Sequence, residues 1–260
     1  MTRIILPTDF SGTSIKAARF AVDLFGIADT RYTLVNSYLR PAYNHAALPD
    51  LTALVVSDSW SGLRRMERWC RKYATGISLS KVSTPALLPE AINDIADGKG
   101  ADMVVMGTQG EGLGRLVGSN TIAVLKRSRT PVITVPSEWE PVKVQRILLA
   151  LDPEPIHRSA IKPLVALAKR TGAEVVVAHV RSNAIFMEKT FGREDIDREL
   201  DGIKHSYVTV QGDDVVATIN DLARNGRIQL VATVHRDRGF WDGLFHASKA
   251  KRMVLHTRMP

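Results

Sequence analysis

Five glycines fall within residues 107–118, between an apolar run that ends at Met106 and a helical pattern that continues to Arg127. Glycine tolerates positive φ and lets the backbone approach a ligand closely, so the N–H groups of such a loop can turn inward around an anion. Ser119 follows the last of these glycines and is expected to cap the next helix, whose free N–H groups and positive dipole end attract negative charge. The expected occupant of this loop is a phosphate group.

This glycine loop differs from both of the common phosphate motifs. The sequence contains no Gly-x-x-x-x-Gly-Lys-Ser/Thr, and no Gly-x-Gly-x-x-Gly follows the first apolar strand. Because the phosphate-binding lysine and an acidic partner strand are both missing, a motor-type NTPase is not expected.

Asp9 is the second candidate for chemistry. It closes the run Ile-Ile-Leu-Pro-Thr-Asp at residues 4–9, and its carboxylate can accept a hydrogen bond from a ribose hydroxyl, an adenine amino group or a metal-bound water. Asp also commonly caps helices, and a helical pattern begins just after it. Since Ser11 stands closer to that helix, we expect Ser11 to be the cap and Asp9 to remain available to a ligand.

The elements that must position these residues occur twice along the chain. Residues 4–9 align with 147–152, and residues 32–36 align with 175–179; each is a short apolar run typical of a buried parallel strand. The later pairs are the helical patterns 91–96 and 217–223, the strands 102–106 and 229–233, and the closing segments 126–131 and 255–260.

Strands that alternate with helical patterns of about 10–15 residues predict right-handed βαβ units and a parallel sheet covered on both faces. We therefore predict an α/β protein with two tandem doubly wound domains, residues 1–137 and 143–260, joined by a linker at 137–141. Each has an open parallel five-stranded sheet of order 3-2-1-4-5, but the second copy stops at Pro260 and is expected to lack its fifth strand. In this order strands one and four are neighbours where the winding reverses, so Asp9 faces the glycine loop.

The first half carries extra residues between its second and third strands, at 51–75. This segment predicts a helix whose apolar stripe packs on the core or at a domain interface; the stripe consists of Leu51, Leu54, Val55, Leu63, Met66 and Trp69. Cys70 is the single cysteine of the chain, so it cannot form an internal disulfide. We expect it on the surface of this helix, in a reducing cytoplasm.

Composition narrows the classes of function. The 260-residue chain is 45% hydrophobic and 24% charged, and no run approaches the roughly 18 apolar residues of a membrane span. The net charge of +8 is spread over both halves, and the basic clusters at 64–72 and 249–258 carry no nucleic-acid-binding pattern. We therefore expect a cytoplasmic protein with no nucleic-acid partner and no membrane partner.

Four segments together resemble the universal stress protein family: residues 5–11, 104–110, 118–121 and 130–135. The resemblance covers the whole first half and, more weakly, the second. It implies a cytoplasmic stress-response protein that binds ATP or AMP, with or without Mg²⁺, and that acts on an unidentified protein partner. It also implies that the two domains pack as an internal pseudo-dimer, which could assemble further into a homodimer.

In ATP-binding members of that family the pattern is Gly-x2-Gly-x9-Gly-Ser/Thr, which falls by position on Gly107, Gly110, Gly118 and Ser119. Seven residues separate Gly110 from Gly118 where nine are usual. A loop two residues shorter leaves ATP, AMP and the absence of a nucleotide all open.

The resemblance implies further nucleotide contacts outside the glycine loop. They fall on Pro7, Thr8 and Asp9 after the first strand and on Asn120 in the last helix of the domain. A backbone group near Ser37 is expected to read the adenine, although the dipeptide Asn-Ser stands here in place of the usual His-Val.

The aligned loop of the second half has lost the glycine pattern. Val234 and Asp237 stand at the first two glycine positions and Ala247 at the third, whereas Asp152 is kept at the end of the first strand. Side chains at these positions would crowd a phosphate. We expect the second domain to bind no nucleotide and to act as a structural or regulatory partner.

Three functions follow from these expectations. The first is a regulatory protein that binds an adenine nucleotide in its first domain. The second is a slow ATPase in which Asp9 or a bound metal positions water, although no lysine, arginine finger or base can be identified. The third is a nucleotide-free scaffold. The histidines at 235, 246 and 256 match no compact metal motif and no Gly-x-Ser-x-Gly elbow is present, so we expect no metal site and no dedicated catalytic residue.

Overall fold

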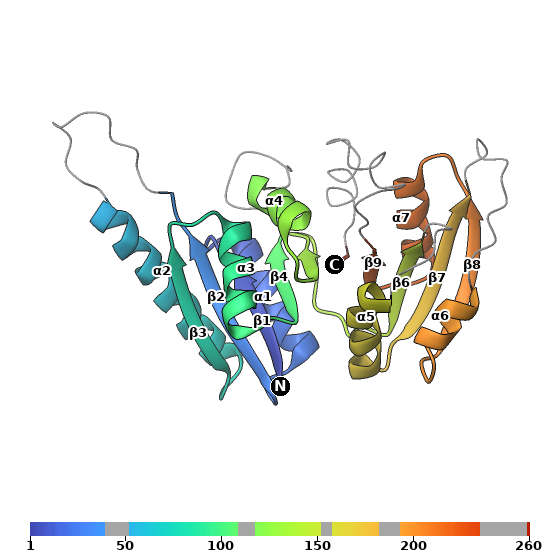
Figure 1. The fold of residues 1–260 in the computed structure, drawn as a ribbon, viewed down its shortest axis with the longest axis horizontal. Coiled ribbons are helices and arrows are strands. Elements are labelled where there is room, and N and C mark those ends of the chain that lie inside the picture. Colours follow the sequence, from blue (N-terminus) through green and yellow to red (C-terminus); the bar gives the residue numbers. More distant parts are fainter. Residues whose placement is uncertain (40–51, 109–117, 152–157, 182–192, 235–258) are drawn as a thin grey trace. The chain divides into compact units, whose positions relative to one another are not determined.

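A computed structural model of the chain describes residues 1–39, 52–108, 118–151, 158–181, 193–234 and 259–260. The chain divides into two compact units, Met1–Trp139 and Glu140–Pro260. Each unit is built on one parallel sheet with helices on its faces (Figure 1). Within the described ranges, no helix is long and apolar enough to cross a membrane.

The sheet of the first unit has five parallel strands in the order β3-β2-β1-β4-β5, which confirms the predicted topology. The strands are β1 (Thr2–Pro7), β2 (Thr30–Ser37), β3 (Ser78–Thr84), β4 (Met103–Gly107) and β5 (Val132–Val135). The helices are α1 (Gly12–Phe25), α2 (Thr52–Tyr73), α3 (Leu88–Lys99) and α4 (Ser119–Arg127).

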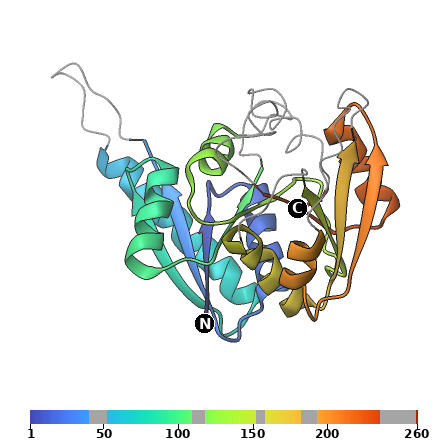
Figure 2. The same ribbon diagram turned by 45° about the vertical axis from the view of Figure 1, so that its right-hand side comes forward.

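Helices cover both faces of this sheet (Figures 1 and 2). α1 packs on β1, β4 and β5 and touches α2, which packs on β2 and β3. α3 and α4 contact each other, and a core forms on their side where Ile5, Val35 and Val104 pack with Ile92 and Val124. Because neither face meets solvent, the central strands are apolar without alternation, as β1 is along its last four residues.

The described part of the second unit contains four parallel strands in the order β8-β7-β6-β9, as expected for a copy without its fifth strand. The strands are β6 (Arg146–Leu151), β7 (Glu174–Arg181), β8 (His205–Gln211) and β9 (Leu230–Thr233). The helices are α5 (Arg158–Thr171), α6 (Arg193–Glu199) and α7 (Val215–Asn225). α7 packs its buried residues Val216 and Ile219 on one face of the sheet, while α5 and α6 contact each other (Figure 2).

Hydrogen bonds confirm the register of the internal repeat. In the first unit the N–H of Val104 in β4 donates to the carbonyl of Pro131, at 2.8 Å. In the second unit the N–H of Val231 in β9 donates to the carbonyl of Pro260, at 2.9 Å. The two prolines therefore take the same place beside the fourth strand of their sheets, as the alignment of residues 126–131 with 255–260 predicts.

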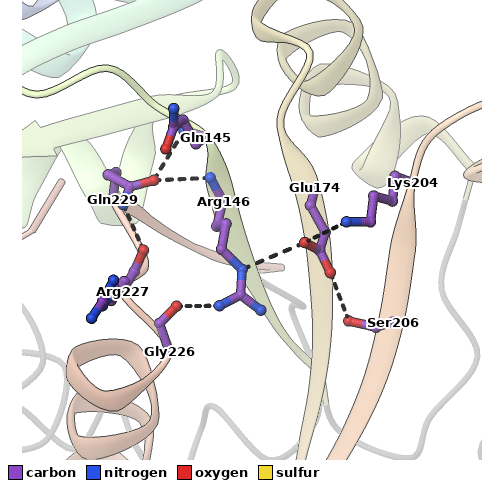
Figure 3. Close-up of polar contacts among 8 residues, drawn as sticks. All are labelled: Gln145, Arg146, Glu174, Lys204, Ser206, Gly226, Arg227 and Gln229. Carbon is purple, nitrogen blue, oxygen red and sulfur yellow. Dashed lines mark hydrogen bonds and ion pairs between the residues drawn. The ribbon is translucent and has the colours of Figure 1, made fainter.

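A side-chain contact at the amino end of the first strand is also repeated. Gln229 Oε1 accepts hydrogen bonds from the backbone N–H groups of Gln145 and Arg146, both at 2.9 Å (Figure 3). In the first unit the carboxylate of Asp102 accepts from the N–H of Arg3 at 2.7 Å. Each contact ties the residue before the fourth strand to the start of the first strand.

The second unit adds an ionic network at this edge (Figure 3). The Arg146 guanidinium donates to the carbonyl of Gly226 and lies 3.6 Å from the carboxylate of Glu174. Glu174 also pairs with Lys204 at 3.4 Å and accepts from Ser206 at 3.2 Å. These contacts join β6, β7 and β8 at their amino ends, opposite the edge where ligands bind in sheets of this kind.

The long helix α2 departs in part from the predicted pattern. Leu63 and Met66 are buried, as the apolar stripe predicts, but Leu54 is 59% exposed, and Leu51 lies outside the described residues. The prediction of a surface thiol is wrong, because Cys70 is fully buried on the face of α2 that meets the sheet. Burial raises the pKa of the Cys70 thiol to about 11, so the thiolate is scarce at neutral pH.

The segment expected to link the two halves is partly docked on the first unit. Trp139 is 4% exposed and packs edge-to-face on Phe20 of α1, with ring centroids 5.3 Å apart. The Lys16 ammonium group donates to the carbonyl oxygens of Ser137, at 2.6 Å, and of Trp139, at 3.3 Å. Residues 137–139 are thus part of the packed first unit.

A titratable cluster joins α6 to β8 in the second unit. His205 Nε2 lies 2.9 Å from the carboxylate of Asp197, and its Nδ1 lies 2.8 Å from the carbonyl of Ile203. Tyr207 donates to the same carboxylate at 2.6 Å, and Arg193 lies over the Tyr207 ring at 4.8 Å. The Ile203 carbonyl first, and then Asp197, hold the pKa of His205 above its ordinary value.

A group whose pKa is raised by folding stabilises the folded state in its protonated form, and that contribution is lost as the pH rises through the folded pKa. We therefore expect the advantage of the wild-type chain over His205→Gln in free energy of unfolding to be largest below about pH 6.5 and to shrink at higher pH. Urea unfolding of both proteins between about pH 5 and pH 9 measures this difference. A difference that grows with pH would contradict the assigned contacts of His205.

Candidate functional site

The carboxyl edge of the first sheet brings two segments together where the winding reverses. β1 lies between β2 and β4, with Ile5 paired to Val104, and both strands run in the same direction. The segment from Thr8 to Ser11 therefore leaves the sheet beside the end of β4 at Gly107. Ligands of open parallel sheets bind at such a reversal point.

Asp9 is exposed at this edge, and the helix cap is made by its neighbour, as predicted. Ser11 is the N-cap of α1, and its Oγ accepts from the N–H of Ser14 at 3.2 Å. Asp9 Oδ1 accepts from the N–H of Ser11 at 3.1 Å. Its other carboxylate oxygen has no hydrogen bond within the described part of the chain, so it can accept one from a ligand.

Pro7 and Thr8 are buried, so their role is to hold the backbone in place beneath the site. Pro7 is the last residue of β1. The N–H of Thr8 donates to the carbonyl of Val35 at 2.9 Å, and its Oγ1 accepts from the N–H of Phe10 at 3.0 Å. The Thr8 side chain also bonds to Ser14 Oγ at 3.0 Å, so its polar atoms are already engaged.

The first turn of α4 offers its backbone N–H groups at the same edge. Gly118 is the N-cap, with φ −59° and ψ 141°, and makes no side-chain cap bond. The prediction that Ser119 is the cap is therefore wrong, because Ser119 is already the first helical residue. Ser119 and Asn120 are exposed, and among the described residues the backbone N–H of neither one has a hydrogen-bond partner. Two donors, a hydroxyl and a side-chain amide are thus available to an anion.

Gly107 and Gly118 do not owe their identity to positive φ. The Gly118 dihedrals are open to any residue, so its backbone does not require glycine. A Cβ at Gly107 would lie 2.7 Å from Thr13 Cγ2 and 3.1 Å from the Thr13 backbone, so glycine is needed there for the approach of α1. The Gly107 carbonyl accepts from the Thr121 hydroxyl at 3.1 Å, which ties α4 to β4. Gly110 lies outside the described residues.

Gly107→Val is expected to lower the free energy of unfolding by about 1–3 kcal/mol, because the added atoms meet backbone that cannot turn aside. Chemical denaturation, with hydrogen exchange of the β4 amides to locate the loss, measures the effect. Gly12→Ala is the matched control, since a Cβ at Gly12 meets nothing within 4 Å. Equal stability of the two variants would show that α1 does not depend on a glycine at this point.

Ser37 ends β2 next to Asn36, a polar residue that was not among the site residues predicted from the sequence. The Ser37 hydroxyl donates its proton to the carbonyl of Ala86 at 2.6 Å, so toward a ligand it can act only as an acceptor. Asn36 is buried, and its Nδ2 donates to the carbonyl of Thr8 at 2.8 Å. An asparagine at the end of an apolar strand was the available signal for this contact.

The second unit repeats this contact with a different residue. His179 aligns with Asn36, and its Nδ1 lies 3.3 Å from the carbonyl of Leu151, which aligns with Thr8. Asp152 and the degenerate loop from residue 235 onward, including Asp237 and Ala247, lie outside the described residues. No group of three His, Cys, Asp or Glu side chains that could hold a metal ion occurs in the described part of either unit.

Comparison with known proteins agrees with this architecture. The model of the universal stress protein family matches residues 1–136. A universal stress protein of Methanocaldococcus jannaschii is 26% identical over 141 residues, which are 51% of this chain and 81% of that protein.

Two solved structures match nearly the whole chain. A universal stress protein from Archaeoglobus fulgidus has a TM-score of 0.70 at 17% identity, over 99% of this chain and 93% of that one. A protein of unknown function from Pseudomonas aeruginosa has a TM-score of 0.64 at 14% identity, over 100% and 90% of the two chains. At these identities the two structures show a shared fold. Because the family model spans more than half of the sequence, the chain belongs to the universal stress protein family.

Proposed function

We propose that the first unit binds one adenine nucleotide at the carboxyl edge of its sheet and that the chain acts as a regulatory binding protein. The observation that carries this proposal is that Asp9 follows β1 while the first turn of α4 is hydrogen-bonded to the end of the neighbouring strand β4, where the strand order reverses. An exposed carboxylate suits the hydroxyl groups of a ribose, and free helix N–H groups suit a phosphate.

Each predicted contact has a place in this proposal. The Asp9 carboxylate accepts from the ribose, and Ser119 and Asn120 donate to the phosphate groups. Gly107, Pro7 and Thr8 support the site from below; the Gly107 carbonyl and the Thr8 N–H and hydroxyl are already hydrogen-bonded within the fold. The backbone near Ser37 is assigned to the adenine, since the Ser37 hydroxyl gives its only proton to the carbonyl of Ala86 and has none to donate to a ligand.

We further propose that the second unit binds no nucleotide, because Val234, Asp237 and Ala247 replace the three glycines of the family pattern. The full chain should therefore bind one nucleotide, not two. Isothermal titration with ATP and with AMP measures both the stoichiometry and the preference between these nucleotides.

The first test is mass spectrometry of small molecules released from the purified full chain, followed by titration of the stripped protein. Released ATP or AMP, or binding of either with a stoichiometry of one, supports the proposal. Binding of neither would overturn it and favour the nucleotide-free scaffold. Formation of ADP during long incubation with ATP would favour the slow ATPase.

A further inference from the structure

Two residues of α2 are linked to the chain on either side of Asp9, one through a hydrogen-bonded intermediary and one by direct packing. The first contact runs through Ser59, whose hydroxyl donates to Asn36 Oδ1 at 2.7 Å. Asn36 in turn donates to the carbonyl of Thr8, the residue before Asp9, at 2.8 Å. Ser59 has one proton and gives it to Asn36, so the Ser83 hydroxyl, 2.6 Å away, donates to Ser59. The chain of hydrogen bonds thus runs from Ser83 through Ser59 and Asn36 to the carbonyl of Thr8.

The second contact involves Phe10, the residue after Asp9. Its ring lies against Gly62 of α2 so closely that a Cβ at Gly62 would overlap three ring carbons. The Arg65 guanidinium lies over the same ring, 5.8 Å from its centroid. Phe10 has φ of 68°, a left-handed conformation that is unfavourable for a bulky residue and persists only where surrounding contacts hold it.

Ser59 and Gly62 are three residues apart and so lie on the same face of α2. That face is anchored in the core, because Leu63 and Cys70 are fully buried and Met66 is 4% exposed. The anchored helix α2 therefore restrains the segment around Asp9. On one side the restraint is a chain of hydrogen bonds, and on the other it is close packing.

We propose that Ser59 and Gly62 are positioning residues that set the orientation of the Asp9 carboxylate for the nucleotide. The inference rests on the proposed nucleotide site, but its geometric part, the restraint of the segment from Thr8 to Ser11, can be measured without a ligand. Loss of either contact gives this segment more conformational freedom. The Asp9 carboxylate is then less often oriented to accept the hydrogen bond from the ribose, and the nucleotide binds more weakly.

The central variant is Gly62→Ala, with Gly98→Ala in α3 as its control. Both replacements improve helix propensity by a similar amount, but a Cβ at Gly98 meets nothing within 4 Å. We expect Gly62→Ala to raise the nucleotide Kd about tenfold and to speed hydrogen exchange of the Ser11 N–H, which is bonded to Asp9. Exchange in the middle of β1 should not change, and Gly98→Ala should match the wild type in both measurements.

A double variant separates positioning from a general loss of structure. Once Phe10→Ala has removed the ring, Gly62→Ala has nothing to displace, so its effect on Kd should vanish in the Phe10→Ala background. Additive effects of the two changes would overturn the inference. Ser59→Ala tests the other contact if Gly62→Ala fails to fold, with faster exchange at Ser11 and a several-fold higher Kd as the expected result.

The outcomes distinguish this inference from the proposed function. If the wild type binds nucleotide, and Gly62→Ala and Ser59→Ala leave both Kd and Ser11 exchange unchanged, α2 does not position Asp9. If neither ATP nor AMP binds the wild type, while both variants speed Ser11 exchange, the nucleotide site is wrong and the restraint by α2 stands.

Discussion

We expect Asp9→Ala to lower the affinity of the full chain for ATP or AMP by about ten- to a hundredfold and to leave its unfolding midpoint nearly unchanged. The affinity falls because a hydrogen bond to a charged group contributes about 1.5–3 kcal/mol. The midpoint holds because Asp9 is exposed and bonds within the described residues only to the N–H of Ser11, which itself caps α1. Titration calorimetry and thermal unfolding of the same preparations give the two quantities.

Ser11→Ala is the matched control for Asp9→Ala. Ser11 is 2% exposed and its hydroxyl caps α1, so its loss should lower the free energy of unfolding by about 1 kcal/mol. The two variants should therefore rank oppositely, with Asp9→Ala worse in affinity and Ser11→Ala worse in stability. If Asp9→Ala instead destabilises the protein as much as Ser11→Ala and binds nucleotide normally, the role of the Asp9 carboxylate is to stabilise the start of α1.

Trp139→Ala lowers the free energy of unfolding of the first unit by about 3–5 kcal/mol, the range found when a buried tryptophan is truncated. The indole packs edge-to-face on Phe20, and the two carbonyls held by Lys16 belong to the same short segment. Since the chain has two units, its unfolding need not be two-state. Native-state hydrogen exchange of the α1 amides assigns the loss to the first unit.

Trp139→Phe is the companion variant and should cost less than about 1.5 kcal/mol. It keeps an aromatic ring against Phe20 and removes the indole N–H, which is buried without a hydrogen-bond partner among the described residues. An effect of Trp139→Ala below about 1 kcal/mol would mean that residues 137–139 behave as a free linker in solution.

Much of the fold could be predicted because it depends on local and repeated signals. Apolar runs without alternation identify strands buried on both faces, and their repetition predicts the shared order of β1, β2 and β4 with β6, β7 and β9. The Ser11 cap follows from the chemistry of two or three neighbouring residues. The same chemistry predicted Ser119 as the cap of α4, but the structure has Gly118 there, which has no side chain to accept a cap bond.

The candidate site could be predicted only in outline. Asp9 and the glycine loop are recognisable from the sequence as residue types suited to a nucleotide, and the predicted strand order puts the end of β1 beside the end of β4, which the structure confirms. The sequence does not show that the close approach of Thr13 requires a glycine at position 107. Nor does it show that Cys70 is on the buried face of α2. Both depend on how closely a helix approaches a strand, which is decided by the sum of many side chains.

The sequence alone therefore determined the α/β class, the duplication, the strand order and the chemical character of the edge at Asp9. Only the tertiary structure decided what holds Asp9 in place. The contacts of Ser59 with Asn36 and of Gly62 with Phe10 join residues far apart in the chain. Such contacts leave no periodic pattern, because they depend on the docking of α2 as a whole rather than on the residues beside them.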